Sequence, residues 1–266
     1  MKAISFKLSG KTACFRKPDV NVYAYFTYNN IHKPALLGLF GAIIGLGGYT
    51  QLHDKKEQMR VKNKALKGKD KKDAEELLKN LDMTFPEFYE KLWHLKVSIT
   101  PLAPNGYFSK KIQIFNNSVG YASFETGGNL IIREQWLENP KWQIMILDDG
   151  SEEFVKISEY LLSGKSVFIP YLGKNDHFAK IDEVETLELL EANGSYIDSL
   201  FIKDFEKFDG WAKENESPFV FQEISPISFQ KDWHFYEYKQ LVFTNYEIET
   251  FPKDTYHYDG KNYTFI

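Results

Sequence analysis

The residues best suited to chemistry lie directly before an apolar, glycine-containing segment at 34–49. They are two amides, an imidazole and an ammonium group: Asn29, Asn30, His32 and Lys33. Pro34 suits the first turn of a helix, so these side chains would surround the free amides and the positive end of the helix dipole. That arrangement favours an anion such as a phosphate. The alternative is an ordinary buried helix preceded by a loop without function.

The apolar segment itself predicts a helix with two faces. One face is broad and apolar, with Leu36, Leu37, Phe40, Ile43 and Ile44 at helical spacing. The other is a stripe of Gly38, Gly41 and Gly45. Glycine inside a helix costs about 0.5–1 kcal/mol relative to alanine, so the stripe predicts close approach by another backbone or by a phosphate chain. The segment is shorter than the about 20 apolar residues of a bilayer span, and we expect no membrane crossing.

Several kinds of catalytic and metal chemistry have no signal in this sequence. Its six histidines do not pair at metal-binding spacings, and it contains no HExxH or CxxC motif, so we expect no metal and no cofactor. Residues 163–166 imitate the end of a phosphate-binding P-loop, but they end a predicted helix instead of opening one. Cys14 is the only cysteine, which excludes an internal disulfide and fits a reducing cytoplasm.

Charge is divided unevenly along the 266 residues, whose net charge is −4. Residues 1–120 hold 20 Lys/Arg and 10 Asp/Glu, whereas residues 121–266 hold 13 and 27. This asymmetry suggests a face for a polyanion on the first half, or a charge complement within or between subunits. The run 53–72 has a net charge of +6 and predicts either a solvated mobile loop or flexible lysines that contact phosphates.

The pattern of the whole chain predicts alternating strands and helices. A long first strand at 2–16 bends at Gly10, and the helix of residues 34–48 follows. Further elements are expected as helices at 74–81 and 85–92, a strand at 94–102, a hairpin with Ile112, Ile114, Tyr121 and Ser123 around a turn at 116–118, strands at 130–133 and 142–147, a helix at 151–164 and a buried strand at 167–171.

The resulting order is strand, helix, strand, insertion, strand, helix, strand. This order is that of an α+β, ferredoxin-like core. We assign residues 1–177 to this core, with an insertion at about 103–140, and residues 178–266 to a β-rich C-terminal extension. The best strands of the extension are 219–225 and 235–243.

Four short motifs carry a resemblance to a known family. They are ACFRKP at 13–18, YNNIHKPALLG at 28–38, GLGGY at 45–49 and IPYLGKNDHF at 169–178. These motifs resemble family five of the CRISPR-associated (Cas) proteins in its type I-B form, a member of the RAMP superfamily. The resemblance is strong over residues 1–50, moderate around 166–180, and limited to general layout elsewhere.

The resemblance implies a binding role in antiviral defence. Members have an RNA-recognition-motif fold, and the insertion would correspond to a projecting β-hairpin thumb. The family is a non-catalytic subunit of the Cascade surveillance complex in the cytoplasm. It holds the 5′ handle of the CRISPR RNA (crRNA), caps the backbone filament and contacts the backbone and large subunits. Target DNA is met indirectly through the complex, and neither a cofactor nor a membrane is involved.

The resemblance also assigns roles to individual residues. Lys11, Arg16 and Lys17 would contact phosphates, and Asn29, Asn30, His32 and Lys33 would bind phosphate or a base edge. Tyr28 and Tyr171 are stacking candidates, and Gly173 would allow close backbone approach beside Lys174 and His177. Each has a structural alternative: such tyrosines are more often core residues, and a histidine like His32, taken alone, is more often a capping or core residue than a ligand.

Two other functions are kept as alternatives. Type I-C relatives cut precursor crRNA without a metal, and Tyr28, His32 and Lys33 supply the residue types for such an endoribonuclease. The third possibility is a protein–protein adaptor whose basic segment serves an acidic partner. Steep salt dependence of RNA binding would separate RNA recognition from the adaptor role.

Overall fold

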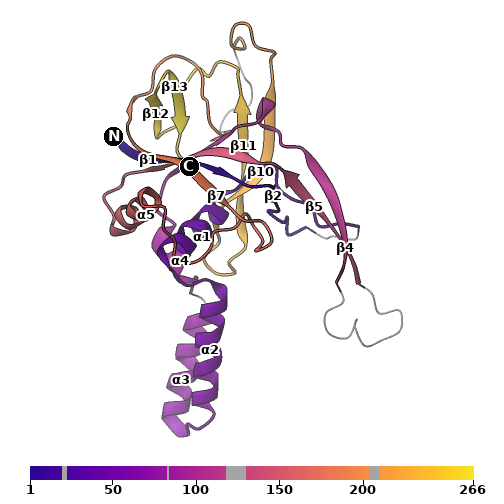
Figure 1. The fold of residues 1–266 in the computed structure, drawn as a ribbon. Coiled ribbons are helices and arrows are strands. Elements are labelled where there is room, and N and C mark those ends of the chain that lie inside the picture. The colour runs from indigo at the N-terminus through magenta and orange to yellow at the C-terminus, as the bar shows by residue number, and fades with distance from the viewer. Residues whose placement is uncertain (20–22, 83, 118–129, 204–209) are drawn as a thin grey trace.

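The computed structural model describes residues 1–19, 23–82, 84–117, 130–203 and 210–266. The protein mixes helices with several antiparallel sheets (Figure 1). The central sheet has the strand order β3-β6-β1-β7. Its strands are β1 (Lys2–Ser9), β3 (Val97–Pro101), β6 (Lys141–Leu147) and β7 (Lys180–Glu188). Helix α1 (Lys33–Ile44) follows β1, and helix α5 (Glu152–Leu162) lies between β6 and β7 in the chain.

The first strand ends earlier than expected. β1 stops at Ser9, and the chain bends at Gly10, as the sequence predicted. A Cβ atom on Gly10 would lie 2.6 Å from the Leu172 side chain and 3.0 Å from the Phe178 carbonyl oxygen, so a larger residue there would require a local shift. After the bend, β2 (Thr12–Ala13) leaves the central sheet and pairs with β5 (Leu130–Glu138). The predicted 2–16 strand is therefore two strands in two sheets.

The buried strand expected at 167–171 is wrong. The amides of Val167 and Phe168 donate to the carbonyls of Ile43 and Ala42 at the end of α1, not to a sheet. Apart from one isolated bridge, between Tyr171 and Phe178, this segment has no strand pairing, and its apolar side chains are exposed. The fourth strand of the central sheet is β7, which comes from the 178–266 segment and pairs with β1.

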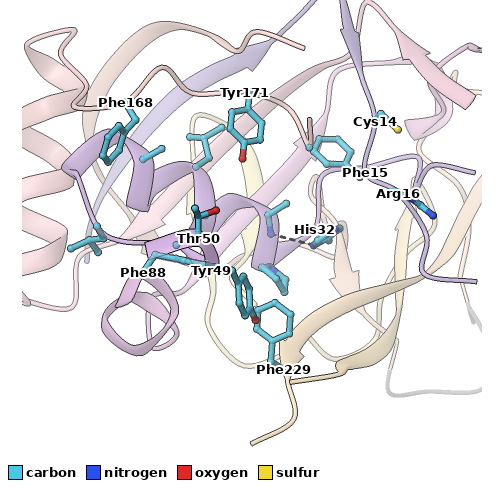
Figure 2. Close-up of a pocket in the computed structure, with 18 of the residues that line it drawn as sticks. Cys14, Phe15, Arg16, His32, Tyr49, Thr50, Phe88, Phe168, Tyr171 and Phe229 are labelled. Atoms are coloured by element: carbon cyan, nitrogen blue, oxygen red, sulfur yellow. Dashed lines mark hydrogen bonds between the residues drawn. The ribbon is translucent and has the colours of Figure 1, made fainter. Parts of the chain in front are cut away.

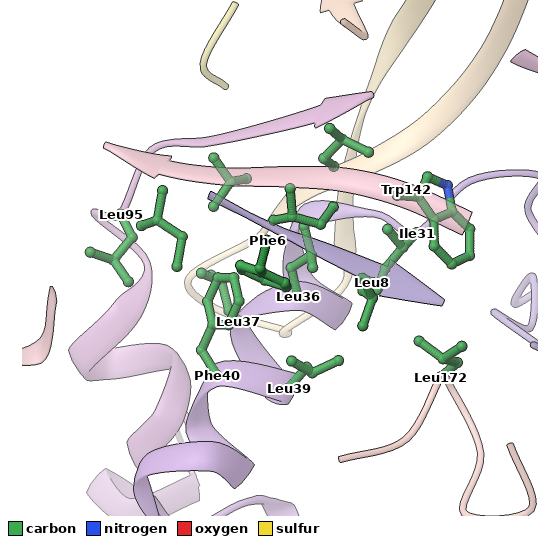
Figure 3. Close-up of a cluster of buried hydrophobic side chains, with 14 of the residues drawn as sticks. Phe6, Leu8, Ile31, Leu36, Leu37, Leu39, Phe40, Leu95, Trp142 and Leu172 are labelled. Atoms are coloured by element: carbon green, nitrogen blue, oxygen red, sulfur yellow. The ribbon is translucent and has the colours of Figure 1, made fainter. Parts of the chain in front are cut away.

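Helix α1 begins where the sequence indicated but ends at Ile44, earlier than the expected end at Gly47-Gly48, and it separates two environments. One face borders a cavity (Figure 2), while Leu36, Leu37 and Phe40 pack on the central sheet against Phe6 and Leu8 (Figure 3). Gly45 ends the helix in the left-handed conformation, φ 83°.

The glycine stripe of α1 packs against other segments of the same chain. A Cβ on Gly41 would lie 2.6 Å from the Phe88 Cβ of α4 (Glu87–Leu92), and one on Gly45 would lie 2.9 Å from the Val167 side chain. The neighbour that approaches the stripe is thus an adjacent segment of this chain.

The charge run is helical, which corrects the expected loop. Helices α2 (Tyr49–Asn63) and α3 (Gly68–Asp82) form a two-helix arm that projects from the body below α1 and α4 (Figure 1). The predicted helix at 74–81 is the second half of α3, and that at 85–92 contains α4. Among the described residues, no single helix is long and apolar enough to cross a bilayer; α1 and α2 pass that test only together and are bent by 72°.

A β-hairpin is the second projection. β4 (Lys110–Asn117) pairs with β5 from Lys110↔Leu137 to Asn117↔Leu130, and the sheet order is β2-β5-β4. Ile112 and Ile114 therefore lie on a hairpin, as expected, but Asn116 is in a strand instead of a turn. The expected partners Tyr121 and Ser123, with Ser118, lie outside the described residues.

Two small sheets complete the chain. β9 (Phe201–Ile202), β10 (Val220–Phe229) and β11 (Tyr236–Thr244) have the order β10-β11-β9, which confirms strands near 219–225 and 235–243. β8 (Leu190–Glu191), β12 (Thr255–Tyr258) and β13 (Lys261–Thr264) have the order β13-β12-β8. A 3-10 turn, η1 (Pro104–Gly106), precedes the hairpin. Strand β10 matters for the site, because it reaches the start of α1.

Candidate nucleic-acid interface

His32 caps α1 from within the protein. Its Nδ1 atom accepts a hydrogen bond from the Ala35 amide at 3.2 Å. The ring is 4% exposed and makes edge contacts with Phe15, Tyr28 and Tyr236. Burial lowers the pKa of His32 to about 3, which keeps the imidazole neutral and able to accept. His32 therefore occupies the capping position that the sequence left as its structural alternative.

The amides before α1 bind a carboxylate of the protein itself. Glu223 of β10 accepts hydrogen bonds from the backbone amides of Asn29, at 2.8 Å, and Asn30, at 3.3 Å. Burial raises the pKa of Glu223, while these two amides and the cations Lys17 and Lys110 favour its charged form. A carboxylate of the protein thus occupies the place where the sequence predicted an external anion.

The side chains of Asn29 and Asn30 are also used internally. Asn29 donates to the Gly106 carbonyl at 2.8 Å and accepts from the Phe108 amide at 3.1 Å. Asn30 accepts from the Trp142 indole at 3.0 Å. Both are buried, so they fix the loop against η1 and β6 and do not face solvent.

Tyr28 and Lys33 lie beside this loop at different depths. Tyr28 is buried, with the Lys17 ammonium 5.1 Å from its ring centroid, and burial raises its pKa. This is the core position that the sequence allowed as an alternative to stacking. Lys33 is half-buried at the first turn of α1, and burial together with the nearby charge of Lys96 lowers its pKa to about 8.

The 171–178 segment packs on β2 and β5. Gly173, at φ 88°, comes so close to Cys14 that a Cβ would lie 1.9 Å from the Cys14 carbonyl oxygen. The expected close approach at Gly173 is therefore to protein backbone. His177 is buried, with Nδ1 2.7 Å from the Thr12 hydroxyl, and burial lowers its pKa. Tyr171, in contrast, is 47% exposed and is available for stacking.

Lys174 pairs with a buried carboxylate. Its ammonium lies 2.8 Å from both oxygens of Glu134, which is 5% exposed and also accepts from the Trp136 indole at 3.0 Å. The same ammonium is 5.7 Å from the Phe115 ring centroid. The positive charge of Lys174 is largely balanced at this position.

Cations and aromatic rings alternate around the β2-β5-β4 sheet. The Arg16 guanidinium lies 3.5 Å from the Tyr25 ring centroid, and that of Arg133 lies 5.2 Å from Tyr23. Further pairs are Lys17 with Tyr28, Lys110 with Tyr107, Lys111 with Trp136 and Lys174 with Phe115. We call these six pairs the cation–aromatic set. Such interleaving is typical of proteins that bind single-stranded nucleic acid.

The two faces of the hairpin differ in charge. The strand register places Lys110, Gln135 and Arg133 on one face, together with the exposed Ile112 and Ile114. The opposite face contains Glu134 and Glu138, which pair with Lys174 and, at 3.8 Å, with Lys111. The first face, which we call the open face, contains no Asp or Glu from the described parts of β4 and β5. It is therefore the more favourable face for phosphates.

Sequence reasoning found only part of this interface. Lys11 and Arg16 are exposed near the bend after β1, and Lys17 is half-buried beside them, as a phosphate site requires. Lys110, Lys111 and Arg133 were missed, because the insertion was treated only as a projection. A signal existed in the tyrosine that precedes two lysines by three and four positions, at 107, 110 and 111.

A cavity of about 710 Å3 lies along the small residues of α1, Ala35, Gly38 and Ala42. Figure 2 shows Tyr171 and Phe168 on one side of it and Tyr49 and Phe229 on the other, with Arg16 near one end. Its volume is within the range of about 300–1,000 Å3 of small-ligand sites. Over the described ranges, no group of three or more His, Cys, Asp or Glu side chains could hold a metal ion.

Comparisons with known proteins give distant structural likenesses. No family model matches the chain, and no curated protein matches it. A solved structure titled as a CRISPR RNA-guided surveillance complex has a chain with 12% identity and a TM-score of 0.46, covering 92% of this chain and 90% of its own. A CRISPR protein from Archaeoglobus fulgidus has 11% identity and a TM-score of 0.42, covering 99% and 98%.

A third likeness is to a chain of the type III-B Cmr-beta complex bound to cognate target RNA and AMPPnP. It has 10% identity and a TM-score of 0.34, covering 94% of this chain and 84% of that one. The chain is thus similar, at a coarse level, to CRISPR proteins and to components of RNA-guided complexes.

Proposed function

We propose that this chain is a non-catalytic crRNA-binding subunit of a type I-B CRISPR Cascade complex. In this role it holds the 5′ handle, caps the backbone filament and contacts the large subunit in the cytoplasm. The observation that carries the proposal is the cation–aromatic set around the β2-β5-β4 sheet. The motifs at 13–18, 28–38, 45–49 and 169–178 support the choice of family.

The order of elements supports the same family. β1, α1, β3, β6, α5 and β7 follow each other as in a split βαβ fold, and the sheet order is β3-β6-β1-β7. We therefore assign these six elements to a ferredoxin-like, RAMP-type core. The β4–β5 hairpin is then the thumb, and the sheets after β7 are the C-terminal extension.

The chemistry of the set suits single-stranded RNA. Unpaired bases stack on aromatic rings and guanidinium planes, while cations contact the backbone. Arg16 and Arg133 offer both a stacking plane for a base and a cation for a phosphate, because each guanidinium already lies over a tyrosine ring. The handle would run from Lys11, Arg16 and Tyr171 onto the open face, with Lys17 and Lys110 beside it. The more buried residues of the motifs would then support this surface from beneath: Tyr28, Asn29, Asn30, His32, Gly173 and His177. Lys33 would lie at its edge.

A binding role without catalysis fits the state of two of the three candidate catalytic residues, His32 and Tyr28. His32 is buried, and its Nδ1 atom already accepts from the Ala35 amide. Burial raises the pKa of Tyr28, which opposes its use as a base. In the proposed state, neither ring reaches a ribose hydroxyl without rearrangement of the loop.

Filter binding of handle RNA over a salt series tests the binding role. Replacing Arg16 and Arg133 together (R16Q/R133Q) should weaken binding and reduce the slope of log K against log salt by about 1.4, from two lost contacts to a single strand. The control K231Q/K253Q removes two exposed lysines far from the set in sequence and should leave the slope unchanged. A flat salt response of the unmodified protein would favour the adaptor instead.

Incubation of the protein with repeat RNA in EDTA tests the absence of catalysis. We expect tight binding and no cut products. Cleavage that disappears in a His32→Ala variant would overturn this part of the proposal and favour the metal-independent endoribonuclease.

A further inference from the structure

The α2–α3 arm carries its positive charge at one end. From Arg60 to Lys72 the sequence has seven Lys/Arg and one Asp, whereas 49–59 and 73–82 together have three Lys and six Asp/Glu. Residues 60–72 include the turn between the helices, which lies farthest from the central sheet (Figure 1). We call residues 60–72 the tip of the arm. The arm is thus polarised, with a basic tip and a weakly acidic base.

Most cations of the tip have no acidic partner. Arg60 pairs with Glu57, and Lys71 lies 4.0 Å from Glu75. The other five are exposed and form no ion pair with any residue that the structure describes: Lys62, Lys64, Lys67, Lys69 and Lys72. Unpaired surface lysines are the groups that release counterions when they meet phosphates.

The arm lacks the side chains that would read unpaired bases or form a typical protein interface. No Phe, Tyr or Trp occurs between Thr50 and Thr84. Stacking on aromatic rings contributes much of single-strand binding, and protein interfaces are enriched in aromatic residues and depleted in lysine. This contrasts with the hairpin, where every cation of the set lies near a ring. The tip therefore suits regularly spaced backbone phosphates more than splayed bases.

We propose that the tip of the α2–α3 arm binds the phosphate backbone of a double-stranded nucleic acid without reading its sequence. Two helices of 15 residues, each about 22 Å long, hold the lysines on a defined projection. Duplex DNA and duplex RNA share the phosphate chemistry, and the test separates them. The inference uses none of the residues of the proposed handle site.

The test uses the full-length chain with four tip lysines neutralised, K62Q/K64Q/K67Q/K69Q. Glutamine matches lysine closely in helix propensity, so circular dichroism should be unchanged. The control is K165Q/K231Q/K253Q/K261Q, which removes four exposed lysines outside the arm. Affinity is measured by filter binding over a salt series for duplex DNA, duplex RNA and handle RNA of equal length.

We expect the tip variant to bind duplex at least about tenfold more weakly and to lose about 3 to 4 from the salt slope, while the control and handle RNA binding stay unchanged. Loss with only one duplex would identify the source and support the proposal. A loss of affinity for handle RNA alone would overturn the proposal. No loss of affinity for any of the three nucleic acids would also overturn it, and would point to an acidic protein as the partner of the tip. The R16Q/R133Q variant tests the proposed handle site separately: it should lose affinity for handle RNA, whereas the tip variant should not.

Discussion

Around the start of α1, side chains of the protein accept the hydrogen bonds that a bound anion would otherwise accept. Glu223 accepts from the backbone amides of Asn29 and Asn30, and His32 accepts from the backbone amide of Ala35. The sequence predicted that amides at this helix start require an acceptor, but it assigned that role to an external anion. It could not identify Glu223, which is 194 residues from Asn29 and carries no local signal.

Stability at low pH should depend on His32. Its pKa falls from about 6.5 in the unfolded chain to about 3 in the folded protein. Between these values the unfolded chain binds the proton and the folded protein does not, so stability is full above about pH 6.5 and falls as the pH falls. The steepest contribution is about 1.4 kcal/mol per pH unit.

Urea unfolding from pH 7 to pH 4 measures this dependence. The variant His32→Asn keeps a capping oxygen and should show a flatter pH profile than the unmodified protein. The control His53→Asn changes an exposed histidine of α2 and should leave the profile as it is. Equal slopes in all three proteins would contradict the role of His32.

Lys174 should matter for stability as well as for charge. Its removal by Lys174→Met leaves the buried Glu134 carboxylate with only the Trp136 indole as a polar side-chain partner. An unpaired buried charge is costly, so we expect a loss of about 2 kcal/mol in the free energy of unfolding, measured with urea.

The double variant Glu134→Gln/Lys174→Met should recover part of that loss, because it removes the unpaired charge. Two losses that simply add would show that the ion pair is not energetically coupled.

At the scale of elements, the packing of α1 against α4 makes two similar substitutions differ in sign. In Gly41→Ala the new Cβ would lie 2.6 Å from the Phe88 Cβ, so α4 must shift, at a cost of about 1–3 kcal/mol. In Gly38→Ala the nearest atom of Phe88 is 3.8 Å away. That substitution should stabilise by about 0.5–1 kcal/mol through helix propensity.

Thermal unfolding of the two variants decides this point. Gly41→Ala should lower the melting temperature, and Gly38→Ala should raise it. A similar rise in both would mean that Phe88 moves aside without cost.

Elements with strong local patterns were predictable from the sequence, and those decided by distant partners were not. α1, β6, α5 and the strands near β10 and β11 follow hydrophobic periodicity. The 167–171 segment is as apolar as a strand, but its first two amides donate hydrogen bonds to carbonyls at the end of α1 and not to a neighbouring strand. The 53–72 run is helical although it has few apolar residues, and charge alone suggested a loop. The roles of Arg16 and Lys11 as exposed cations were predictable; those of Lys110 and Arg133 depend on strand register.

At the scale of the whole molecule, the body and the arm should differ in resistance to protease. The described residues of α2 include none that is buried, and among the α3 side chains that the structure describes Ala74 alone is buried. The central sheet, by contrast, packs large side chains on both α1 and α5. The arm therefore contributes little apolar burial to the stability of the body.

Limited trypsin digestion followed by mass spectrometry measures this difference. We expect first cuts between Arg60 and Lys72, with the two fragments remaining associated on a sizing column. Early cuts in β1 or β6, or fragments that separate, would show that the arm and the body unfold together. Added duplex DNA should slow the first cuts if the tip binds it.

The bond between Glu223 and the Asn29–Asn30 amides also bears on how the protein matures on the ribosome. The segment that precedes α1 leaves the exit tunnel early, yet the carboxylate that completes it is synthesised 194 residues later. Until then the nascent chain lacks this acceptor, and strand β10 is incomplete. The loop that precedes α1 consequently reaches its final hydrogen bonding only after β10 has been synthesised, which is later than the folding of the neighbouring helix requires.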